Sequence, residues 1–443
     1  MGRLFGTDGV RGVAGAELTA DLARGLGQAA VGVLAAGSHH RPVFVVGRDP
    51  RESGTWLEGS LVTGIQEAGG DVLLAGVEPT PAVAFLTIDG RADAGVVISA
   101  SHNPPEYNGI KFFGPNGMKL PDAVEDRIEA GLSDAAPPDA DPGTVEELLG
   151  GRERYLDHLE KAAGARLDGM TLVVDCANGA ASAPAPALYE RLGATVHAIH
   201  ASPDGRNINV DCGALHPEVA GRIVLELGAD AGVSHDGDAD RALFTDHRGR
   251  VVDGDQVLAA CAIALKEDGA LPGDAVVTTV MANLGFHRAM LDAGIAVTAT
   301  KVGDRYVLEE MVELGATVGG EQSGHLIFLD HATTGDGLLT AVRFLSLAAR
   351  SGRTVADLAG LMRRYPQVTE NVRVRSLREL DGSTDVWDIV GAVEEQLADT
   401  GRVLVRASGT EPLVRVMVEA ESEEVAARHA ETIAGAVRRH LGA

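Results

Sequence analysis

Three aspartates, Asp236, Asp238 and Asp240, alternate with small residues in this chain. Carboxylates about 4 Å apart repel each other by roughly 4 kcal/mol at an effective dielectric constant of about 20, so a cation is needed to hold them together. An all-oxygen ligand set favours Mg²⁺ or Ca²⁺. An EF-hand loop requires Gly at its sixth position and Glu at its twelfth, where this chain has Arg241 and His247. The pattern therefore predicts another kind of hard-metal site, with a solvated acidic loop as the alternative.

A candidate nucleophile, Ser101, lies in a run of turn-forming residues directly after an apolar segment. A serine hydroxyl is a poor nucleophile without a base or a metal, and His102 and Lys111 are near enough in sequence to assist. The segment alone is equally compatible with an ordinary turn. In combination with the aspartates it predicts a phosphoryl carrier. A phosphoserine carries about −1.5 to −2 charges, which a metal could neutralise during transfer.

A second phosphate-binding candidate lies near the C-terminus, where arginines flank small and hydroxylated residues. Small residues expose the backbone, and the fork of an arginine matches a phosphate bidentately. A hairpin turn with surface arginines is the alternative interpretation. The residues of this candidate cradle are Arg406, Ser408, Gly409, Thr410 and Arg415.

Further polar residues are candidates for sugar contacts. Glu321 and Ser323 alternate in an extended run and could hydrogen-bond to sugar hydroxyls. His325 could be a general base, although an isolated histidine is more often packed and hydrogen-bonded. Lys301 and Arg305 could contact substrate or be solvated.

Two glycine-rich runs carry less information. The run ending in Arg11 predicts nothing specific by itself. The run 25–30 fits G-x-G-x-x-A, but it lies within a helix-period stretch and not after a strand, so helix packing explains it better. The sequence G-x-x-x-x-G-K-[ST] is absent, which leaves P-loop nucleotide hydrolysis unsupported.

Short β-branched runs alternate with amphipathic stretches, as is typical of βαβ units. The motifs around Ser101, Asp236 and Glu321 each follow an expected strand. Ligands of open α/β sheets bind at the carboxyl ends of strands, so three such units could aim one motif each at a shared cleft. We expect strands at 43–46, 72–74, 95–98, 172–174, 195–198, 231–233, 275–280 and 316–318, and helices at 20–34, 55–68 and 258–266.

The chain of 443 residues is long for one core, which suggests three or four domains. The acidic, Pro-rich segment 133–143 is expected to be a loop or linker near a domain end. The last ~75 residues favour a small α+β module with an antiparallel sheet. Its expected elements are strands at 371–374, 402–407 and 413–419, a helix around 386–397 and a terminal helix.

Composition and charge exclude several classes of partner. A formal charge of −26 argues against non-specific binding to nucleic acid or to an anionic membrane. Cys176, Cys212 and Cys261 form no CxxC pair, so neither a zinc site nor a disulfide framework is indicated. The N-terminal residues carry no apolar signal segment and no run approaches ~18 apolar residues, so we expect a cytoplasmic protein.

Five runs of residues together resemble the α-D-phosphohexomutase family. They occur in the family's order and cover essentially the whole chain. They are FGTDGVRG (5–12), SASHNPPEYNGIK (99–111), DGDADR (236–241), GEQSGH (320–325) and RASGTEPLVR (406–415).

The resemblance implies an α/β fold with three similar domains, each with a mixed sheet, around a central cleft, and a smaller C-terminal α+β domain. We expect these domains at 1–150, 151–252, 253–368 and 369–443. The resemblance also implies a phosphorylated Ser101 and one Mg²⁺ per subunit, on Ser101 and the three aspartates. The implied partners are a small phosphosugar, a kinase or autophosphorylation for Ser101, and a second subunit in a homodimer.

The roles that the resemblance implies for single residues follow the motifs. Catalysis would involve Ser101, Lys111, His102, Arg11 and His325, with Arg241 supporting the metal ligands. Sugar or phosphate contacts would come from Glu321, Ser323, Lys301, Arg305, Arg406, Ser408, Gly409, Thr410 and Arg415.

Within the family, the chain is similar to the bacterial branch that acts on glucosamine phosphates. Gln322 is typical of that branch, whereas mannose and glucose relatives usually carry Met there. Asp304 stands where some relatives place a His, which removes one candidate base. The implied reaction interconverts glucosamine 6-phosphate and glucosamine 1-phosphate through a 1,6-bisphosphate. The same chemistry on mannose or glucose phosphate, or a metal-dependent phosphosugar phosphatase, are the alternatives.

Overall fold

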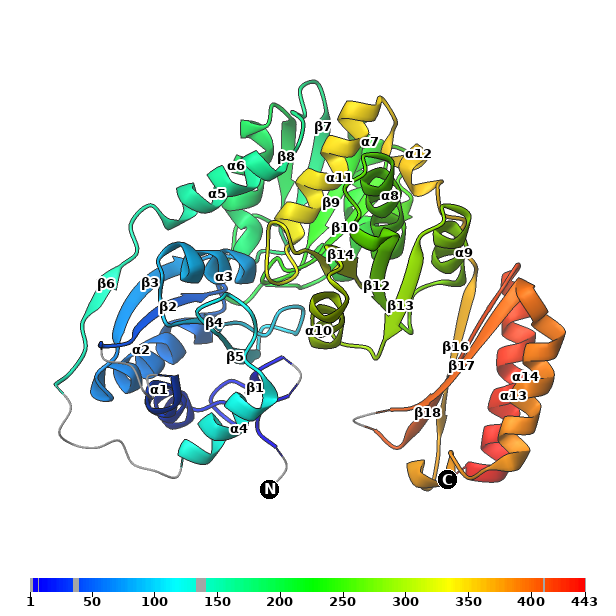
Figure 1. The fold of residues 1–443 in the computed structure, drawn as a ribbon, viewed down its shortest axis with the longest axis horizontal. Helices are drawn as coiled ribbons and strands as arrows, with labels where there is room; N and C mark the ends of the chain where they lie inside the picture. The colour runs from blue at the N-terminus through cyan, green and yellow to red at the C-terminus, as the bar shows by residue number, and fades with distance from the viewer. Residues whose placement is uncertain (1–2, 7, 35–39, 133–140, 409–410, 443) are drawn as a thin grey trace. The chain divides into compact units, whose positions relative to one another are not determined.

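A computed structural model describes residues 3–6, 8–34, 40–132, 141–408 and 411–442. The chain forms two compact units, of which the larger comprises 1–281 with 294–361 and the smaller comprises 282–293 with 362–443. The larger unit contains three sheets and the smaller unit contains one (Figure 1). No helix of the described residues is long and apolar enough to cross a membrane.

The first sheet is mixed and has six strands in the order β1-β5-β4-β2-β3-β6. Side chains alternate across it, so that Val46 packs under α1 and α2 while Val45 packs under α3 on the other face. β5 runs antiparallel to both β1 and β4. The bounds are β1 Val10–Val13, β2 Val43–Arg48, β3 Asp71–Val77, β4 Ala94–Ile98, β5 Tyr107–Phe113, β6 Val145–Glu147, α1 Ala20–Leu34, α2 Glu52–Glu67, α3 Thr80–Asp89 and α4 Asp122–Gly131.

The second sheet has the order β11-β10-β9-β7-β8, in which β7, β8 and β9 are parallel and the β9–β10 and β10–β11 pairs are antiparallel. Strand β9 is buried along its whole length and ends directly before Asp236. The bounds are β7 Thr171–Asp175, β8 Thr195–Ile199, β9 Ala231–His235, β10 Ala242–Asp246, β11 Val251–Val252, α5 Gly151–Ala162, α6 Pro184–Arg191 and α7 Pro217–Leu227.

The third sheet has the order β13-β12-β14-β15. β12 is parallel to β13 and β14, and β15 returns antiparallel to β14. The bounds are β12 Ala275–Thr279, β13 Ala296–Thr300, β14 Val318–Gly320, β15 Leu326–Phe328, α8 Gly254–Glu267, α10 Asp304–Leu314, α11 Gly337–Ser351 and α12 Val355–Ala359.

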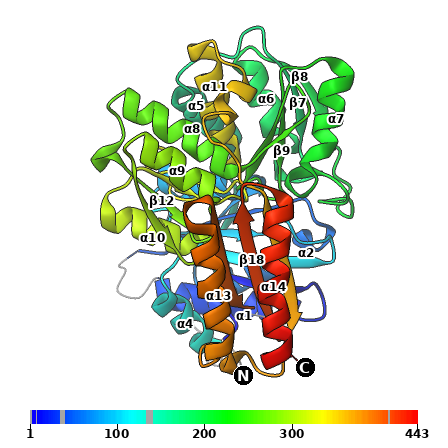
Figure 2. The ribbon, with the colours of Figure 1, turned by 90° about the vertical axis from the view of Figure 1, so that its right-hand side faces the viewer.

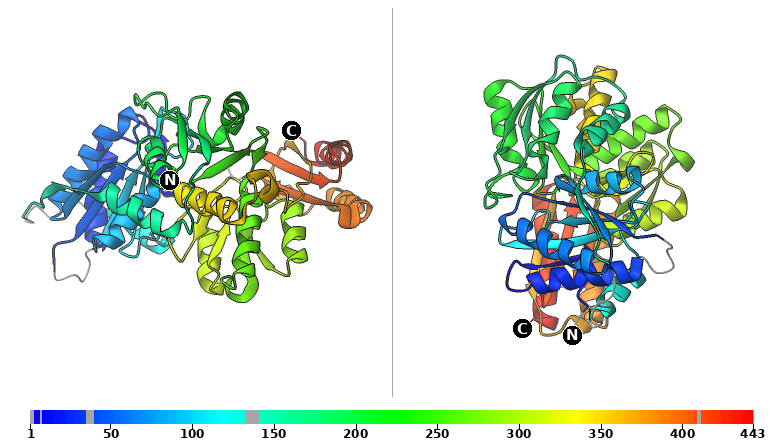
Figure 3. Two further views of the ribbon diagram at one scale, coloured as in Figure 1. Left: turned by 90° about the horizontal axis from the view of Figure 1, so that it is seen from above. Right: turned by 90° about the vertical axis from the view of Figure 1, so that its left-hand side faces the viewer.

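The smaller unit contains an antiparallel sheet in the order β16-β18-β17. Two helices, α13 and α14, pack side by side on one face of it (Figures 1, 2 and 3). The segment with α9 belongs to this unit because Glu419 of β18 accepts hydrogen bonds from Asn283 Nδ2 (3.3 Å) and Leu284 N (2.7 Å). The bounds are α9 Leu284–Asp292, β16 Gln367–Arg373, β17 Gly401–Ala407, β18 Leu413–Ala420, α13 Thr384–Leu397 and α14 Glu423–Leu441.

The fold class agrees with the expectation, with three sheets of mixed or parallel character and a smaller antiparallel one. The helix expected at 20–34 has these bounds as α1. The strand expected at 316–318 begins only at Val318, because the amide of Ala316 donates to Met311 O and closes α10. Most of the expected linker, 133–140, lies outside the described residues.

Candidate active site

The loop that carries Ser101 begins after Ile98, the last residue of β4. Ser101 has a left-handed backbone with a φ of 51°, a conformation that costs a non-glycine residue about 1–3 kcal/mol and persists only when its surroundings hold it. The buried guanidinium of Arg51 donates to the carbonyl oxygens of Ser101 and Asn103, each at 2.9 Å. Asn209 Nδ2 donates to the same two oxygens at 2.8 and 3.0 Å. The serine is therefore presented by a preorganised loop.

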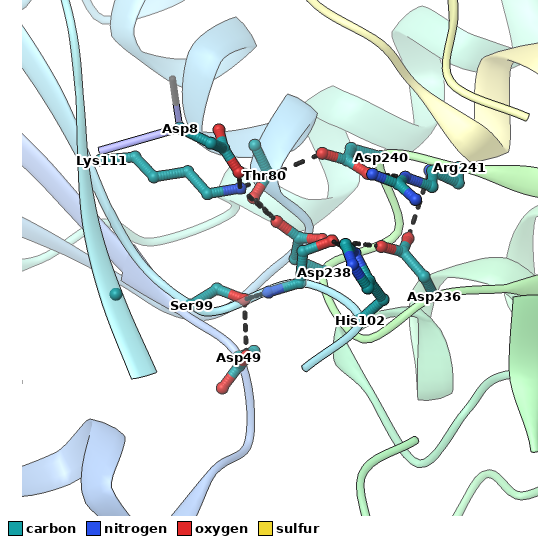
Figure 4. A network of polar contacts seen from close by, with 12 residues as sticks. Asp8, Asp49, Thr80, Ser99, His102, Lys111, Asp236, Asp238, Asp240 and Arg241 are labelled. Carbon is teal, nitrogen blue, oxygen red and sulfur yellow. Dashed lines mark hydrogen bonds and ion pairs between the residues drawn. The ribbon is translucent and has the colours of Figure 1, made fainter. Parts of the chain in front are cut away.

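The backbone amide of Ser101 is also oriented by buried side chains. Ser99 Oγ accepts a hydrogen bond from this amide at 2.9 Å and donates to Asp49 Oδ2 at 2.6 Å. Asp49 in turn pairs with Arg51 Nε at 2.8 Å. Ser99 and Asp49, which are joined in Figure 4, thus form one buried support under the loop together with Arg51.

The hydroxyl of Ser101 points at Asp236, the first of the three clustered aspartates. Its Oγ donates to Asp236 Oδ2 at 2.6 Å and lies 3.3 Å from Nδ1 of His102. Burial lowers the pKa of His102 to about 4, and the nearby guanidinium groups of Arg241 and Arg11 act in the same direction. His102 is therefore neutral near pH 7, so its ring can accept a proton or a hydrogen bond.

The three aspartates follow β9 and form the aspartate site, defined as Asp236, Asp238 and Asp240. One carboxylate oxygen from each lies within 4.8 Å of the others, and all three side chains are buried. Burial and the charges of Asp240 and Asp238 raise the pKa of Asp236 well above its usual value. Oδ1 of Asp238 and Oδ1 of Asp240 have no hydrogen-bond partner among the described residues. These orphaned, mutually repelling oxygens fit a divalent cation with a preference for oxygen ligands.

Lys111 brings a positive charge to the aspartate site from β5, where it stands opposite Val97 of β4. Its Nζ lies 2.9 Å from Asp238 Oδ2 and 2.9 Å from Asp8 Oδ2. Burial alone would lower the pKa of Lys111, but these two carboxylates raise it above its usual value. Thr80 Oγ1 donates to the same Asp238 oxygen at 2.7 Å. Lys111 is therefore a fixed cation in this arrangement.

A buried chain of charges leads from Lys111 towards the third sheet. Lys119 Nζ lies 2.5 Å from Asp8 Oδ1 and also pairs with Asp304 at the start of α10. Burial alone would raise the pKa of Asp8, but the ammonium groups of Lys111 and Lys119 hold it well below its usual range. His325 Nε2 lies 3.7 Å from Asp304 Oδ2. The chain thus joins elements of the first and third sheets.

The sugar-contact candidates of the third sheet lie on the connection from β14 to β15. Glu321 Oε1 accepts a hydrogen bond from the amide of Gly303 at 3.0 Å, and Ser323 Oγ lies 3.5 Å from Glu321 Oε2. His325 is buried, and neither of its ring nitrogens has a hydrogen-bond partner in the described structure. An imidazole in this state is available to exchange a proton with a ligand.

Other predicted residues have partners within the protein. Arg11 pairs with Asp8. Arg241 lies 3.6 Å from Asp240 Oδ1 through its Nε, and its amide donates to Asp236 at 3.2 Å. Arg305 is not joined to the aspartate site, because it pairs with Asp122 and Glu125 and donates to Leu120 O at 3.2 Å. Lys301 is exposed, with its Nζ 5.9 Å from the centre of the Tyr306 ring. For Arg305 and Lys301 a substrate contact stays a prediction.

The C-terminal phosphate candidates lie in the smaller unit. Arg406 of β17 stands opposite Arg415 of β18 in the ladder. Burial and the charge of Arg415 lower the pKa of Arg406. Ser408 is buried, and its amide donates to Leu413 O at 2.8 Å. Gly409 and Thr410 lie outside the described residues. Two facing guanidinium groups repel each other, and a bound dianion would relieve that repulsion.

Sequence models of one family match the chain in four successive segments. They are phosphoglucomutase/phosphomannomutase alpha/beta/alpha domain I over residues 2–137, domain II over 153–249, domain III over 253–365 and the C-terminal domain over 370–436. The chain belongs to the phosphoglucomutase/phosphomannomutase family. The resemblance inferred from the five motifs is thereby confirmed.

Individual relatives agree with this membership. Proteins named phosphoglucosamine mutase from Rhodococcus jostii and Moorella thermoacetica are each 53% identical to this chain, over 99% and 96% of both sequences respectively. A crystal structure of a family protein from Burkholderia thailandensis has a TM-score of 0.83 and 28% identity, and covers 99% of this chain and 97% of that one.

A more distant solved structure shares the fold. It is the N-acetylphosphoglucosamine mutase of Aspergillus fumigatus, in complex with GlcNAc-6P and magnesium. Its TM-score is 0.70 at 18% identity, and the match covers 98% of this chain and 95% of that one.

Proposed function

We propose that this protein is a phosphoglucosamine mutase, which interconverts glucosamine 6-phosphate and glucosamine 1-phosphate through a phosphorylated Ser101 and a 1,6-bisphosphate. The observation that carries the proposal is the 2.6 Å contact of Ser101 Oγ with Asp236, inside a cluster of three buried aspartates and one buried lysine. A serine in such surroundings is suited to carry a phosphoryl group.

Mg²⁺ fits the proposed site. Asp236, Asp238 and Asp240 would hold the ion together with the phosphate of Ser101, and when bound it would supply charge neutralisation for the transferring phosphoryl group. Lys111, held by Asp238 and Asp8, adds a positive charge from the chain itself. Ser101 is buried, and exclusion of water from its surroundings would protect a phosphoenzyme from hydrolysis.

The first half-reaction transfers the phosphoryl group from Ser101 to a sugar hydroxyl. The P–O bond to Ser101 Oγ breaks and a P–O bond to the sugar oxygen forms, while in net terms one proton moves from that hydroxyl to Oγ. We assign His325 to accept and release this proton, because its buried ring nitrogens carry no other hydrogen bond among the described residues. Lys111 is less suited, because two carboxylates keep it protonated.

The second half-reaction reverses these steps from the other end of the sugar. After the bisphosphate turns around, its original phosphoryl group moves to Ser101 Oγ and the product leaves with the new one. The arginines of the smaller unit, Arg406 and Arg415, are proposed to hold the phosphate that is not reacting. Glu321 and Ser323 are proposed to bind sugar hydroxyls. No inorganic phosphate is released in this cycle.

Glucosamine phosphate is favoured as the substrate by the relatives. Two proteins with 53% identity over nearly the full chain are named phosphoglucosamine mutase. Gln322, the residue that is typical of the glucosamine branch in the resemblance described above, stands between the proposed sugar ligands Glu321 and Ser323 in the sequence of the same loop. The cytoplasmic location, the homodimer and the source of the first phosphate on Ser101 stay predictions.

Two measurements test the proposal separately. Comparison of kcat/KM for the 1-phosphates of glucosamine, glucose and mannose should favour glucosamine by at least about tenfold. A tenfold preference for glucose 1-phosphate would contradict the proposed substrate but would leave the proposed mutase reaction intact. Release of inorganic phosphate in step with substrate loss would instead overturn the mutase and indicate a phosphatase.

A further inference from the structure

A second cluster of ligating side chains lies in the second sheet, apart from the aspartate site. We call it the Asp175 site, and it comprises Asp175, His200 and Cys212. Asp175 is the last residue of β7 and His200 directly follows β8, the neighbouring parallel strand. One ligand atom from each of the three residues lies within 4.8 Å of the other two.

The carboxylate of Asp175 is fully buried and only half used. Its Oδ1 accepts a hydrogen bond from the amide of Ala177 at 3.0 Å, whereas Oδ2 has no hydrogen-bond partner among the described residues. A buried carboxylate oxygen without a hydrogen bond is costly, since it has lost its water and no donor has replaced it. This oxygen is therefore expected to have a ligand.

The imidazole of His200 meets this oxygen in an unusual way. Its Nδ1 lies 3.1 Å from Asp175 Oδ2, yet the two atoms are not aligned as a hydrogen bond, and Nδ1 has no other partner in the described structure. His200 Nδ1 and Asp175 Oδ2 can therefore both direct a lone pair at a common third point. Such convergence is the arrangement of two ligands around one ion.

The thiol of Cys212 completes the cluster and identifies the class of ion. The Cys212 side chain is buried and forms no disulfide. A set of one sulfur, one nitrogen and one oxygen ligand is typical of Zn²⁺ and not of Mg²⁺, which takes oxygen ligands. His200 keeps a third of its side chain exposed, so solvent can reach the ion.

We propose that Asp175, His200 and Cys212 bind Zn²⁺, with water as the fourth ligand. Zn–S bonds of about 2.3 Å and Zn–N and Zn–O bonds of about 2.0–2.2 Å place the ligand atoms of a tetrahedral ion roughly 3.3–3.6 Å apart. The three ligand atoms here lie within 4.8 Å of one another. On binding, the thiol of Cys212 loses its proton to solvent, so that the sulfur–zinc bond forms as the S–H bond breaks. The neutral imidazole binds through the lone pair of one nitrogen.

The Asp175 site is connected to the loop that carries Ser101. Cys212 lies three residues after Asn209, whose side chain donates to Ser101 O at 2.8 Å. The amide of Asn209 also donates to Ala177 O at 2.9 Å, which ties its segment to the turn after β7. Bound zinc would therefore hold in place a segment that supports this loop, whatever reaction Ser101 performs.

Cobalt substitution tests the proposal on the full-length protein. Metal-free protein is titrated with Co²⁺ in the presence of excess Mg²⁺, which occupies the all-oxygen aspartate site. We expect one equivalent of Co²⁺ to produce thiolate-to-cobalt charge-transfer absorption and the intense visible bands of tetrahedral cobalt, and one equivalent of Zn²⁺ to abolish both. Absence of the charge-transfer absorption in the unmodified protein would overturn the proposal.

Variants assign the ligands. Cys212→Ser should lose the charge-transfer absorption, whereas Cys261→Ser, which removes a buried thiol on α8, should keep it. His200→Asn should weaken Co²⁺ binding by more than the roughly 10–100-fold that loss of an outer partner costs, and asparagine tolerates the left-handed backbone of this position (φ 45°). If Cys212→Ser does not fold, His200→Asn decides. Unchanged Co²⁺ affinity in that variant, or absorption that persists in Cys212→Ser, would contradict the proposal.

Discussion

At the scale of single residues, Lys119 shows how a charge outside the reacting cluster can organise it. Its largely buried ammonium group pairs with two carboxylates. Asp8 lies just before β1 of the first sheet, and Asp304 is the first residue of α10, which packs on the third sheet. Removing one partner of a buried ion pair is costly by about 3–5 kcal/mol, because the other charge stays buried. Here two carboxylates would be left, and one of them, Asp8, also holds Lys111.

The substitution Lys119→Met should therefore lower kcat by about 10–100-fold with a smaller change in KM, because Asp8 and through it Lys111 would lose their positions. Steady-state kinetics would measure this split, and Lys119→Arg should recover part of the loss by restoring the charge. Lys266→Met is the matched control, since Lys266 pairs with Asp274 at the surface of α8. Equal kinetics for the Lys119 and Lys266 variants would show that Lys119 is not a positioning residue.

At the scale of elements, the site depends on the close approach of two loops. A Cβ atom added to Gly237 would lie 2.5 Å from the carbonyl oxygen of Ser101 and 2.9 Å from Asn209 Nδ2. Both distances are shorter than a van der Waals contact. Only glycine at position 237 therefore lets the loop of the aspartate site touch the loop that carries Ser101. The glycine between Asp236 and Asp238 is thus a steric requirement of the site.

Gly237→Ala should push the two loops apart and lower kcat/KM by at least about 100-fold, because displacement of about 1 Å at reacting groups has that effect. Gly32→Ala on α1 is the control: no atom lies within 4 Å of its added Cβ, and alanine should stabilise the helix by about 0.5–1 kcal/mol. Kinetics and thermal unfolding of both variants would check this. A Gly237→Ala enzyme with normal kcat/KM would mean that the loops need not touch.

The sequence predicts the elements that carry the reacting groups better than those that support them. The three aspartates and Ser101 could be found because their types and spacing suggest chemistry, and the alternating apolar runs predicted the strands before them. Arg51, Asp49 and Asn209 could not, because each is a single polar residue that contacts the serine loop from a distant part of the chain. An arginine next to the start of a helix is normally exposed, whereas Arg51, which directly precedes α2, is fully buried.

Other elements escaped prediction for a topological reason. The sequence shows that Lys111 is close enough to Ser101 to assist it, but not that Lys111 lies on β5, an antiparallel strand between β1 and β4. This strand directly follows a run of turn-forming residues, and it is recognised only from its pairing with β1 and β4. Asp8 and Lys119 escaped for a similar reason, because Lys119 contacts Asp8 across 111 residues of chain and Asp304 across 185.

At the scale of the whole molecule, the residues assigned to the proposed reaction are distributed over the two compact units. The serine, the aspartate site and His325 belong to the larger unit, whereas Arg406 and Arg415 belong to the smaller one. The net charge of −26 makes local cations necessary for any anionic ligand. The facing pair of arginines on β17 and β18 is the smaller unit's candidate for that task.

Arg415→Ala should raise KM for glucosamine 6-phosphate by about tenfold or more, with a smaller effect on kcat, because a charge-assisted contact to the non-reacting phosphate would be lost. Steady-state kinetics at constant ionic strength would measure this change. Arg438→Ala is the matched control, since Arg438 pairs with Glu370 and Glu431 on the surface of the same unit. An unchanged KM for Arg415→Ala would assign the arginine pair to another task.

The most direct test of the central claim follows one phosphoryl group from Ser101 to the sugar. Intact-mass spectrometry of the purified protein, combined with peptide mapping, should find one phosphate on Ser101, and none in Ser101→Ala. Mixing phosphoenzyme that carries ³²P on Ser101 with one equivalent of glucosamine 6-phosphate should move the label to the sugar, first in glucosamine 1,6-bisphosphate and then in glucosamine 1-phosphate as the other phosphoryl group returns to Ser101. Label that stays on the protein, or that appears as inorganic phosphate and not on the sugar, would contradict the account.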